Sequence, residues 1–305
     1  MSWFEETLYR DVGQRFIVGR TLYREKTEHQ DLVIFENPVM GRILALDGVI
    51  QTTERDEFIY HEMLTHVPIM AHGAVKRVLI IGGGDGGMLE EVLKHPVEKC
   101  TMVEIDRAVV DLSIKYLPSI CGKAFEDKRT ELIITDGLKY AAETQDKFDV
   151  IIVDSTDPMG PGEVLFTTQF YTDCRRCLNP GGLLVTQNGV PFFQAEELRM
   201  TRGRLKPLFK DVACYLAAIP TYYGGFMAFG WGTDNADARR QPVEAIRRRF
   251  DRIKLDTRYY TPDVHVAAFA LPKFVADLIG QAQHPRSIAP AHQTTARSRP
   301  TCPSP

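Results

Sequence analysis

The chain has little of what a membrane or nucleic-acid-binding protein needs. No apolar run approaches the roughly 18 residues that cross a bilayer, and the opening MSWFEETLYRDVG has no signal-peptide core. The net charge is −3 and the pI about 6.3, which does not indicate a general basic surface. We therefore expect no membrane partner, no nucleic-acid partner and a cytoplasmic location.

Cysteine is also scarce, with six residues in a chain of 305. Their spacing forms no disulfide framework. One CxxC pair, Cys174-Arg-Arg-Cys177, falls in the middle of a predicted helix and has no second pair, so metal or redox use is not expected. The others lie at positions 100, 121, 214 and 302. This pattern fits a reducing compartment.

One stretch, RVLIIGGGDGGM at residues 77–88, organises most of the chain. The apolar run 78–81 predicts a fully buried strand, and a helical pattern resumes at Met88. The turn between them is glycine-rich: Gly82, Gly83, Gly84 and Gly86. Strand, turn and helix predict the start of a doubly wound nucleotide-binding sheet, although the turn alone also fits a simple βα connection.

Asp85 lies inside this turn and limits what can bind there. A dinucleotide would put its pyrophosphate on the N-terminus of the following helix. A carboxylate at that point would repel phosphate strongly at low effective dielectric. The turn therefore favours a nucleoside without phosphate that carries positive charge, and it disfavours a dehydrogenase.

The first part of the chain predicts a different architecture. Residues 1–54 have the Val, Ile, Leu and Thr content of strands, broken by turn residues, and predict a small antiparallel β domain. Asp47-Gly48 between apolar runs predicts a hairpin. Residues 55–75 are predicted to be a connecting helix, and the helical pattern of apolar residues itself runs from Glu54 to Met70.

Residues 76–281 alternate strand and helix patterns. This alternation predicts a mostly parallel sheet with helices on both faces, ended by an antiparallel pair of strands on either side of Gly224-Gly225. Residues 282–305 are rich in Pro, Ser, Ala and Arg and predict a disordered tail.

Acidic residues recur where the predicted strands end: Asp85, Glu104, Asp136, Asp154 and Asp157. Ligands of open α/β sheets bind beyond these carboxyl ends, so the five side chains should share one crevice. Glu104 lies twenty residues after Gly84, the spacing of an acid that binds ribose hydroxyls. Asp136 taken alone fits a helix N-cap equally well.

The acidic cluster predicts a cationic ligand. Mutual repulsion makes such a cluster costly unless positive charge neutralises it. The acids lack the regular short spacing of a calcium loop, and His61 is far away in sequence, so we expect no metal. An organic polycation bound beside a nucleoside explains the acidic cluster more simply than a metal does. Asp154 and Asp157 could grip an amine and deprotonate it.

These residues belong to segments that resemble the spermidine synthases, a family of aminopropyltransferases. The resemblance covers about residues 4–280 and rests on HQDLVIFEN, LDGVIQTTERDEFIYHEM, LIIGGGDGG, MVEID, DVIIVDSTDPMGPGEVLF, LNPGG and IPTYYGG. It implies an α/β fold: a Rossmann-like doubly wound sheet of the S-adenosylmethionine-dependent methyltransferase type, with a small N-terminal antiparallel β domain. It also implies transfer of the aminopropyl group of decarboxylated S-adenosylmethionine to putrescine, without cofactor or metal, by a homodimer or homotetramer.

The resemblance also implies roles for individual residues. The nucleoside site would contain Gln30, Gln51, Asp85, Glu104, Asp136, Gly137 and Pro161. The polyamine site would contain Tyr60, His61, Asp85, Asp154, Asp157 and Tyr222. Asp85 would bind the aminopropyl amine, Asp157 would anchor the diamine, and Asp154 would accept its proton. Without the resemblance, a hydrogen-bonded core histidine and ordinary aromatic packing would be the preferred interpretations of His61, Tyr60 and Tyr222.

Two other functions remain open at this point. A methyltransferase that uses S-adenosylmethionine would share the strand, the glycine turn and the ribose acid, but Asp85 would then face the substrate carboxylate. A catalytically silent polyamine-binding sensor would share the acids without turnover. The acceptor also stays open, because cadaverine, spermidine and agmatine differ from putrescine only in length and end group.

Overall fold

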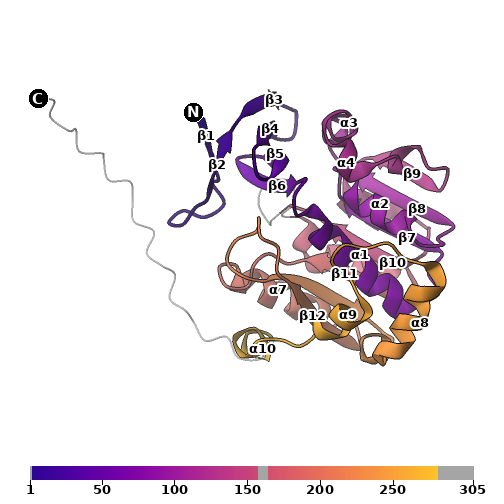
Figure 1. Cartoon of the computed structure of the whole chain (residues 1–305). Helices are drawn as coiled ribbons and strands as arrows, with labels where there is room; N and C mark the ends of the chain where they lie inside the picture. Colours follow the sequence, from indigo (N-terminus) through magenta and orange to yellow (C-terminus); the bar gives the residue numbers. More distant parts are fainter. Residues whose placement is uncertain (1, 157–163, 281–305) are drawn as a thin grey trace, which may run out of the picture.

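The structure is a computed structural model that describes residues 2–156 and 164–280. A large mixed sheet is flanked by helices, and smaller antiparallel sheets precede it in the chain (Figure 1). The predicted α/β fold with an N-terminal antiparallel β part is confirmed. Asp157, Pro161, Cys302 and the predicted tail lie outside the described residues.

The N-terminal part forms two sheets. In the first, β1 (Ser2–Glu5) pairs with β2 (Arg15–Val18). The second contains, in chain order, β3 (Arg20–Lys26), β4 (Asp31–Asn37), β5 (Gly41–Leu46) and β6 (Val49–Thr53). The predicted hairpin joins β5 to β6. Asp47 and Gly48 both have positive φ, 49° and 80°, as a type I′ turn requires.

The central sheet has the strand order β12-β13-β11-β10-β7-β8-β9. Its strands are β7 (Arg77–Gly82), β8 (Lys99–Glu104), β9 (Thr130–Ile134), β10 (Phe148–Asp154), β11 (Leu178–Gln187), β12 (Asp211–Ala217) and β13 (Met227–Thr233). Strands β11 to β9 are parallel, and β13 and β12 extend the sheet in antiparallel pairing, as predicted. Because β7 and β10 are neighbours while β8 and β9 lie on the far side of β7, the switch point where ligands bind lies between β7 and β10.

Helices cover both faces of this sheet. They are α1 (Glu57–His72), α2 (Gly87–Leu93), α3 (Arg107–Tyr116), α4 (Pro118–Cys121), α5 (Gly137–Glu143), α6 (Thr168–Arg176), α7 (Ala195–Leu205), α8 (Val243–Ile253), α9 (Pro262–Ala267) and α10 (Lys273–Gly280). On β7, Val78 and Ile80 pack with α1 and α2, whereas Leu79 and Ile81 pack with α5 and α6. A strand buried on both faces is continuously apolar, which explains the run at 78–81.

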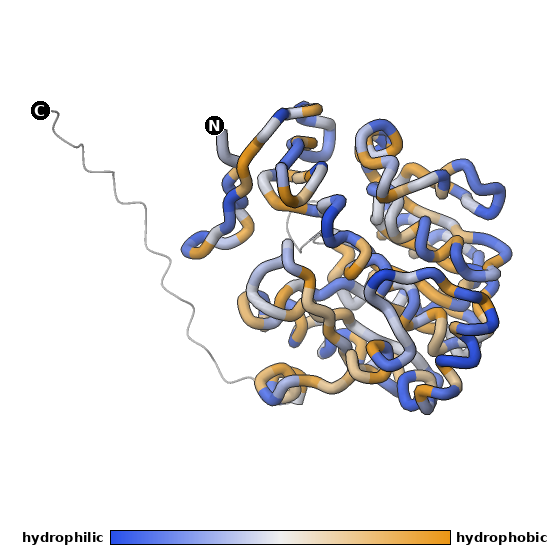
Figure 2. Tube along the Cα trace, viewed as in Figure 1, coloured by the Kyte–Doolittle hydropathy of each residue, from blue (hydrophilic) through white to orange (hydrophobic). Residues whose placement is uncertain are grey.

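A separate apolar cluster joins the four-stranded sheet to helices α3 and α4. Leu32, Ile34 and Leu44 of the four-stranded sheet pack against Val109 of α3 and Leu117 beside α4. Figure 2 shows the hydrophilic residues concentrated along outer segments such as α8. Because α3 follows β8 in the chain, this packing places the four-stranded sheet beside the carboxyl end of β8, and Leu44 and Glu104 line the same pocket.

Some element ends differ from prediction. The helix expected from Glu54 begins at Glu57, because residues 54–56 form a turn. Helix α6 ends at Arg176, so the CxxC pair spans the helix end and not its middle. The five cysteines among the described residues are buried and free.

Two further features of residues 2–156 and 164–280 concern membranes and metals. No described helix combines the length and apolarity that crossing a membrane requires. Nor do three or more His, Cys, Asp or Glu side chains of this part of the chain gather as a metal site.

Candidate active site

A pocket opens at the carboxyl ends of β7, β8 and β10. The N-terminal sheets and the loop between β12 and β13 form its other walls. Most predicted site residues line it: Gln30, Gln51, Tyr60, His61, Gly82, Gly83, Gly84, Asp85, Glu104, Asp136, Gly137, Asp154 and Tyr222. Among its described lining residues there is no lysine or arginine, so the carboxylates give the pocket a negative potential.

The glycine turn makes room for carboxylates. A Cβ on Gly83 would lie 2.9 Å from Asp154 Oδ2, and one on Gly84 would lie 2.9 Å from Glu104 Oε2. Gly82 is tighter still, because its Cβ would lie 2.0 Å from the Asp154 backbone oxygen. Gly86, the remaining predicted member, is not among the lining residues and packs against Phe125, where a Cβ would lie 2.5 Å from the ring.

Asp154 ends β10, directly beside Gly82 in the β7–β10 register. Its Oδ1 accepts a hydrogen bond from the Tyr60 hydroxyl at 2.5 Å. Burial, followed by repulsion from Asp85, raises the pKa of Asp154 to about 6, against the opposing effects of His61 and Tyr60. The carboxylate is thus ionised at neutral pH and still basic enough to take a proton.

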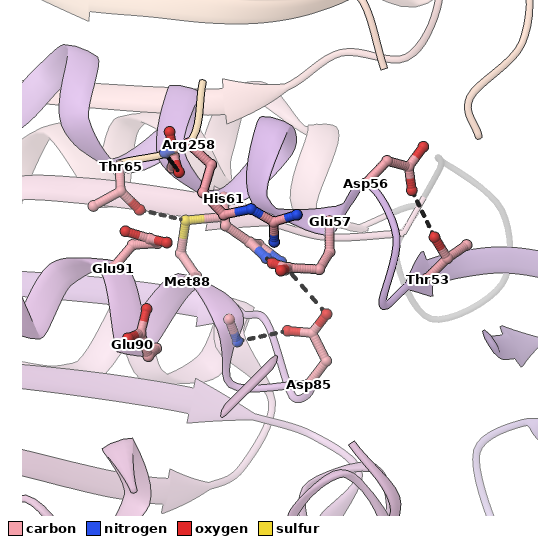
Figure 3. A network of polar contacts seen from close by, with 12 residues as sticks. Thr53, Asp56, Glu57, His61, Thr65, Asp85, Met88, Glu90, Glu91 and Arg258 are labelled. Atoms are coloured by element: carbon pink, nitrogen blue, oxygen red, sulfur yellow. Dashed lines mark hydrogen bonds and ion pairs between the residues drawn. The ribbon is translucent and has the colours of Figure 1, made fainter. Parts of the chain in front are cut away.

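Asp85 and His61 form a pair across the pocket wall (Figure 3). Asp85 Oδ2 lies 3.4 Å from His61 Nε2, and Asp85 Oδ1 accepts the Gly87 backbone N–H at 2.9 Å. Burial opposes ionisation of Asp85, but His61 and this backbone N–H lower the pKa of Asp85 below its ordinary value. His61 is buried and hydrogen-bonded, and it also lines the pocket.

Glu104 ends β8 and is buried. Its Oε1 accepts the Asp106 backbone N–H at 2.9 Å. Burial raises the pKa of Glu104 to about 7. Asp136 is the N-cap of α5, where its side chain accepts the Leu138 N–H at 2.8 Å, and it lines the pocket as well. The two predictions for Asp136, cap and site acid, are therefore compatible.

Three further predicted site residues, Gln30, Gln51 and Tyr222, are held by local contacts. Gln30 Nε2 donates to Asp106 Oδ2 at 3.0 Å, and the Tyr222 hydroxyl donates to the backbone oxygen of Gln51. Tyr222 meets Tyr60 edge to face, with centroids 5.8 Å apart. These contacts connect the β12–β13 loop to β6 and α1.

Several groups in the pocket or directly behind its wall were not predicted. Glu57 contacts His61 from one helical turn away, and the segment EFIYHEM could have indicated it through the i,i+4 spacing. Gln187 ends β11 and donates to the Ser155 backbone oxygen at 3.2 Å. Leu8 and Tyr9, between β1 and β2, also line the pocket, and no sequence motif marks them.

The arrangement suits a nucleoside and a cation together. Apolar side chains such as Ile81, Val103 and Val109 line the part near Glu104, while Asp85 and Asp154 line the part near Tyr60. A methyltransferase-like sheet with an acidic pocket at its switch point defines a class, the transferases that act on small molecules with a nucleoside co-substrate.

Comparisons with known proteins narrow this class. Residues 57–242 match the spermine/spermidine synthase domain, and residues 2–54 match the spermidine synthase tetramerisation domain. The chain therefore belongs to the spermine/spermidine synthase family. It is 60% identical to polyamine aminopropyltransferase 1 of Pseudomonas aeruginosa over 92% of this chain and 99% of the relative. A polyamine aminopropyltransferase of Pectobacterium carotovorum is 56% identical over 92% and 98%.

Two solved structures of spermidine synthases are similar to this chain in fold. A spermidine synthase in complex with the transition-state analogue AdoDATO superposes with a TM-score of 0.86 at 38% identity, covering 92% of this chain and 95% of that one. Spermidine synthase from Thermotoga maritima gives a TM-score of 0.85 at 37% identity, with coverage of 92% and 94%.

Proposed function

We propose that this enzyme is a spermidine synthase that transfers the aminopropyl group of decarboxylated S-adenosylmethionine to putrescine. The products are spermidine and methylthioadenosine. The observation that carries the proposal is the meeting of Asp85 and Asp154 in one pocket whose described lining residues include no lysine or arginine. Such a pocket favours two cationic substrates over a nucleoside that ends in a carboxylate.

The mechanism is a direct displacement. The amine nitrogen forms a bond to the methylene carbon next to the sulfonium, and the carbon–sulfur bond breaks to leave a neutral thioether. The amine must be uncharged to attack, so Asp154 accepts its proton. The raised pKa of Asp154, about 6, supports this role near neutral pH. The sulfonium is its own leaving group, so the two co-substrates suffice without a resident cofactor or metal.

The proposed binding roles assign one part of the pocket to the nucleoside and another part to the amines. Glu104 binds the ribose, while Asp136 and Gly137 contact the adenine side and Gln30 and Gln51 complete this wall. Asp85 binds the aminopropyl amine, and Tyr60, His61 and Tyr222 border the diamine. Pro161 at the nucleoside and Asp157 at the diamine stay predictions, because both lie outside the described residues.

The assembly and its location are also proposals. The match of residues 2–54 to a tetramerisation domain supports a homo-oligomer, proposed as a homodimer or homotetramer. Free buried cysteines among the described residues fit a cytoplasmic enzyme.

Product analysis by mass spectrometry tests the proposal. The enzyme is incubated with decarboxylated S-adenosylmethionine and, in separate reactions, putrescine, cadaverine, spermidine or agmatine. We expect methylthioadenosine and spermidine, with putrescine giving the highest kcat/KM. A preference for S-adenosylmethionine and a methylated product would indicate a methyltransferase. Tight amine binding without product would indicate a sensor.

A further inference from the structure

Glu57 is a largely buried carboxylate that the proposed mechanism does not use. It begins α1, and its side chain is 11% exposed. Its Oε2 lies 2.7 Å from Nδ1 of His61, one helical turn further along. Figure 3 shows Glu57 and His61 projecting from α1 toward Asp85. Glu57 is not among the pocket-lining residues, but His61, which it contacts, is.

The imidazole of His61 lies between two carboxylates. Nδ1 faces Glu57, and Nε2 faces Asp85 at 3.4 Å. A ring with an acceptor at each nitrogen is best satisfied when both nitrogens carry hydrogen, which is the imidazolium form. The ring also packs tightly on the start of α2, since a Cβ on Gly87 would lie 2.2 Å from its Cε1. Orientation and protonation of His61 are therefore both constrained.

We propose that Glu57 is a positioning residue for the amine-binding end of the pocket: it orients His61 toward Asp85 and keeps the imidazole doubly protonated. This inference rests on the proposed function, which assigns that end to amines. Without the Glu57 charge, the buried ring would lose the partner of Nδ1 and favour its neutral form. Asp85 and Asp154 would then repel each other without the nearby positive charge of His61.

The charged groups around His61 support this expected effect of removing the Glu57 charge. The ionisable groups near it come from its own helix, the β7–α2 turn, α2 and β10: Glu57, Tyr60, Asp85, Glu91 and Asp154. Burial lowers the pKa of His61, but the carboxylates of Asp85 and Glu57 raise it well above its ordinary value. The His61 cation in turn lowers the pKa of Asp154. Glu91 is already paired with Lys94 at 2.9 Å and does not replace Glu57.

The test is Glu57→Gln, which keeps the shape of the side chain and removes its charge. We expect the KM for putrescine to rise about 5- to 20-fold while the KM for decarboxylated S-adenosylmethionine changes less than about twofold. The acid limb of the kcat/KM profile should move up by about 0.5 to 1 pH unit, because Asp154 loses the nearby cation. NMR of histidine-labelled protein, assigned with His61→Asn, should show imidazolium in wild type at pH 8 and neutral imidazole in the variant.

Glu98→Gln is the control, since exposed Glu98 pairs with Lys76 at 2.8 Å and not with His61. It should leave all three readouts unchanged. Imidazolium retained in Glu57→Gln, or an unmoved profile with unchanged KM values, would overturn the proposal. If wild type makes no spermidine, the proposed function fails, yet the NMR comparison still reports whether Glu57 sets the state of His61.

Discussion

Asp154 and Glu104 are both buried carboxylates at strand ends, yet their surroundings differ in ways that matter for chemistry. The Asp154 carboxylate accepts a hydrogen bond from Tyr60 and has Asp85 and His61 as charged neighbours. Glu104 is held by the backbone of its own loop and lies beside Gly84. We expect Asp154 to exchange protons during turnover and Glu104 to bind hydroxyl groups throughout.

Replacing Asp154 tests whether its carboxylate acts as the base. Asp154→Asn should lower kcat by about 10²- to 10⁴-fold, because the amine keeps its proton, with nucleoside affinity changed only a few-fold. In wild type, kcat/KM should fall as the pH drops through about 6, where Asp154 becomes protonated. Stopped-time product assays and calorimetry with methylthioadenosine measure both effects.

Asp149→Asn is the matched control on the same strand. Asp149 accepts the backbone N–H groups of Lys76 and Arg77 at the opposite end of β10, away from the pocket. Its replacement should leave kcat near wild type. Near-normal turnover of Asp154→Asn would remove Asp154 from the base role.

Among the elements, the start of α1 connects most parts of the site. Tyr60 and His61 lie in its first turns and contact Asp154 and Asp85. Asp56, just before the helix, does not cap α1 with its side chain. Its Oδ2 instead accepts both N–H and Oγ1–H of Thr221 at 2.7 Å, which holds the loop that carries Tyr222. The geometry of this corner thus depends on one buried carboxylate.

Removing that carboxylate should affect both stability and binding. For Asp56→Ala we expect a loss of about 2 to 4 kcal/mol in the free energy of unfolding, since buried hydrogen bonds to a charged group are lost. The KM for putrescine should rise as the Tyr222 loop loosens. Urea unfolding and steady-state kinetics give the two values.

A helix N-cap residue that does not line the pocket provides the control for Asp56→Ala. Thr261, the N-cap of α9, accepts the Val264 N–H at 3.1 Å, and Thr261→Ala should cost about 1 kcal/mol without changing KM. If Asp56→Ala altered stability alone, the proposed link between the α1 start and the amine end would be wrong.

The sequence predicts many of the helices and strands. The strand at β7, the helix α3 and the antiparallel pair β12–β13 follow from local patterns of apolar residues and turn signals. Element ends are less predictable. The segment Asn179-Pro180-Gly181-Gly182 has the composition of a turn between helix and strand, but it lies inside β11, whose pairing with β10 shifts register there. Long-range pairing decided that boundary.

For the molecule as a whole, the acidic pocket is expected to reduce stability. The folded state raises the pKa of Glu104 from 4.5 to about 7, so between these values it binds more protons than the unfolded chain. The free energy of unfolding from this group therefore falls as the pH rises through that window, and the cost is complete above about pH 7. Function and stability are opposed at this position.

Glu104→Gln makes this cost measurable. The variant should be more stable than wild type by about 1 to 3 kcal/mol at pH 8, and the advantage should disappear near pH 4.5. Affinity for methylthioadenosine should fall. Urea unfolding at several pH values measures the difference, and exposed Glu98→Gln, which breaks only the surface pair with Lys76, should show almost none of it. A less stable Glu104→Gln at pH 8 would contradict the expectation.

The sequence by itself determined the strands, the glycine turn, the Asp47-Gly48 hairpin and the positions of acids at strand ends, because these depend on periodicity and local backbone preference. Only the tertiary structure decided which of these acids meet. The strand order puts β10 beside β7, so that Asp154 lies against the glycines. Packing between distant segments brings the β1–β2 segment to the same pocket and His61, with Glu57 behind it, to Asp85. Such contacts depend on packing between distant segments, which no local pattern encodes.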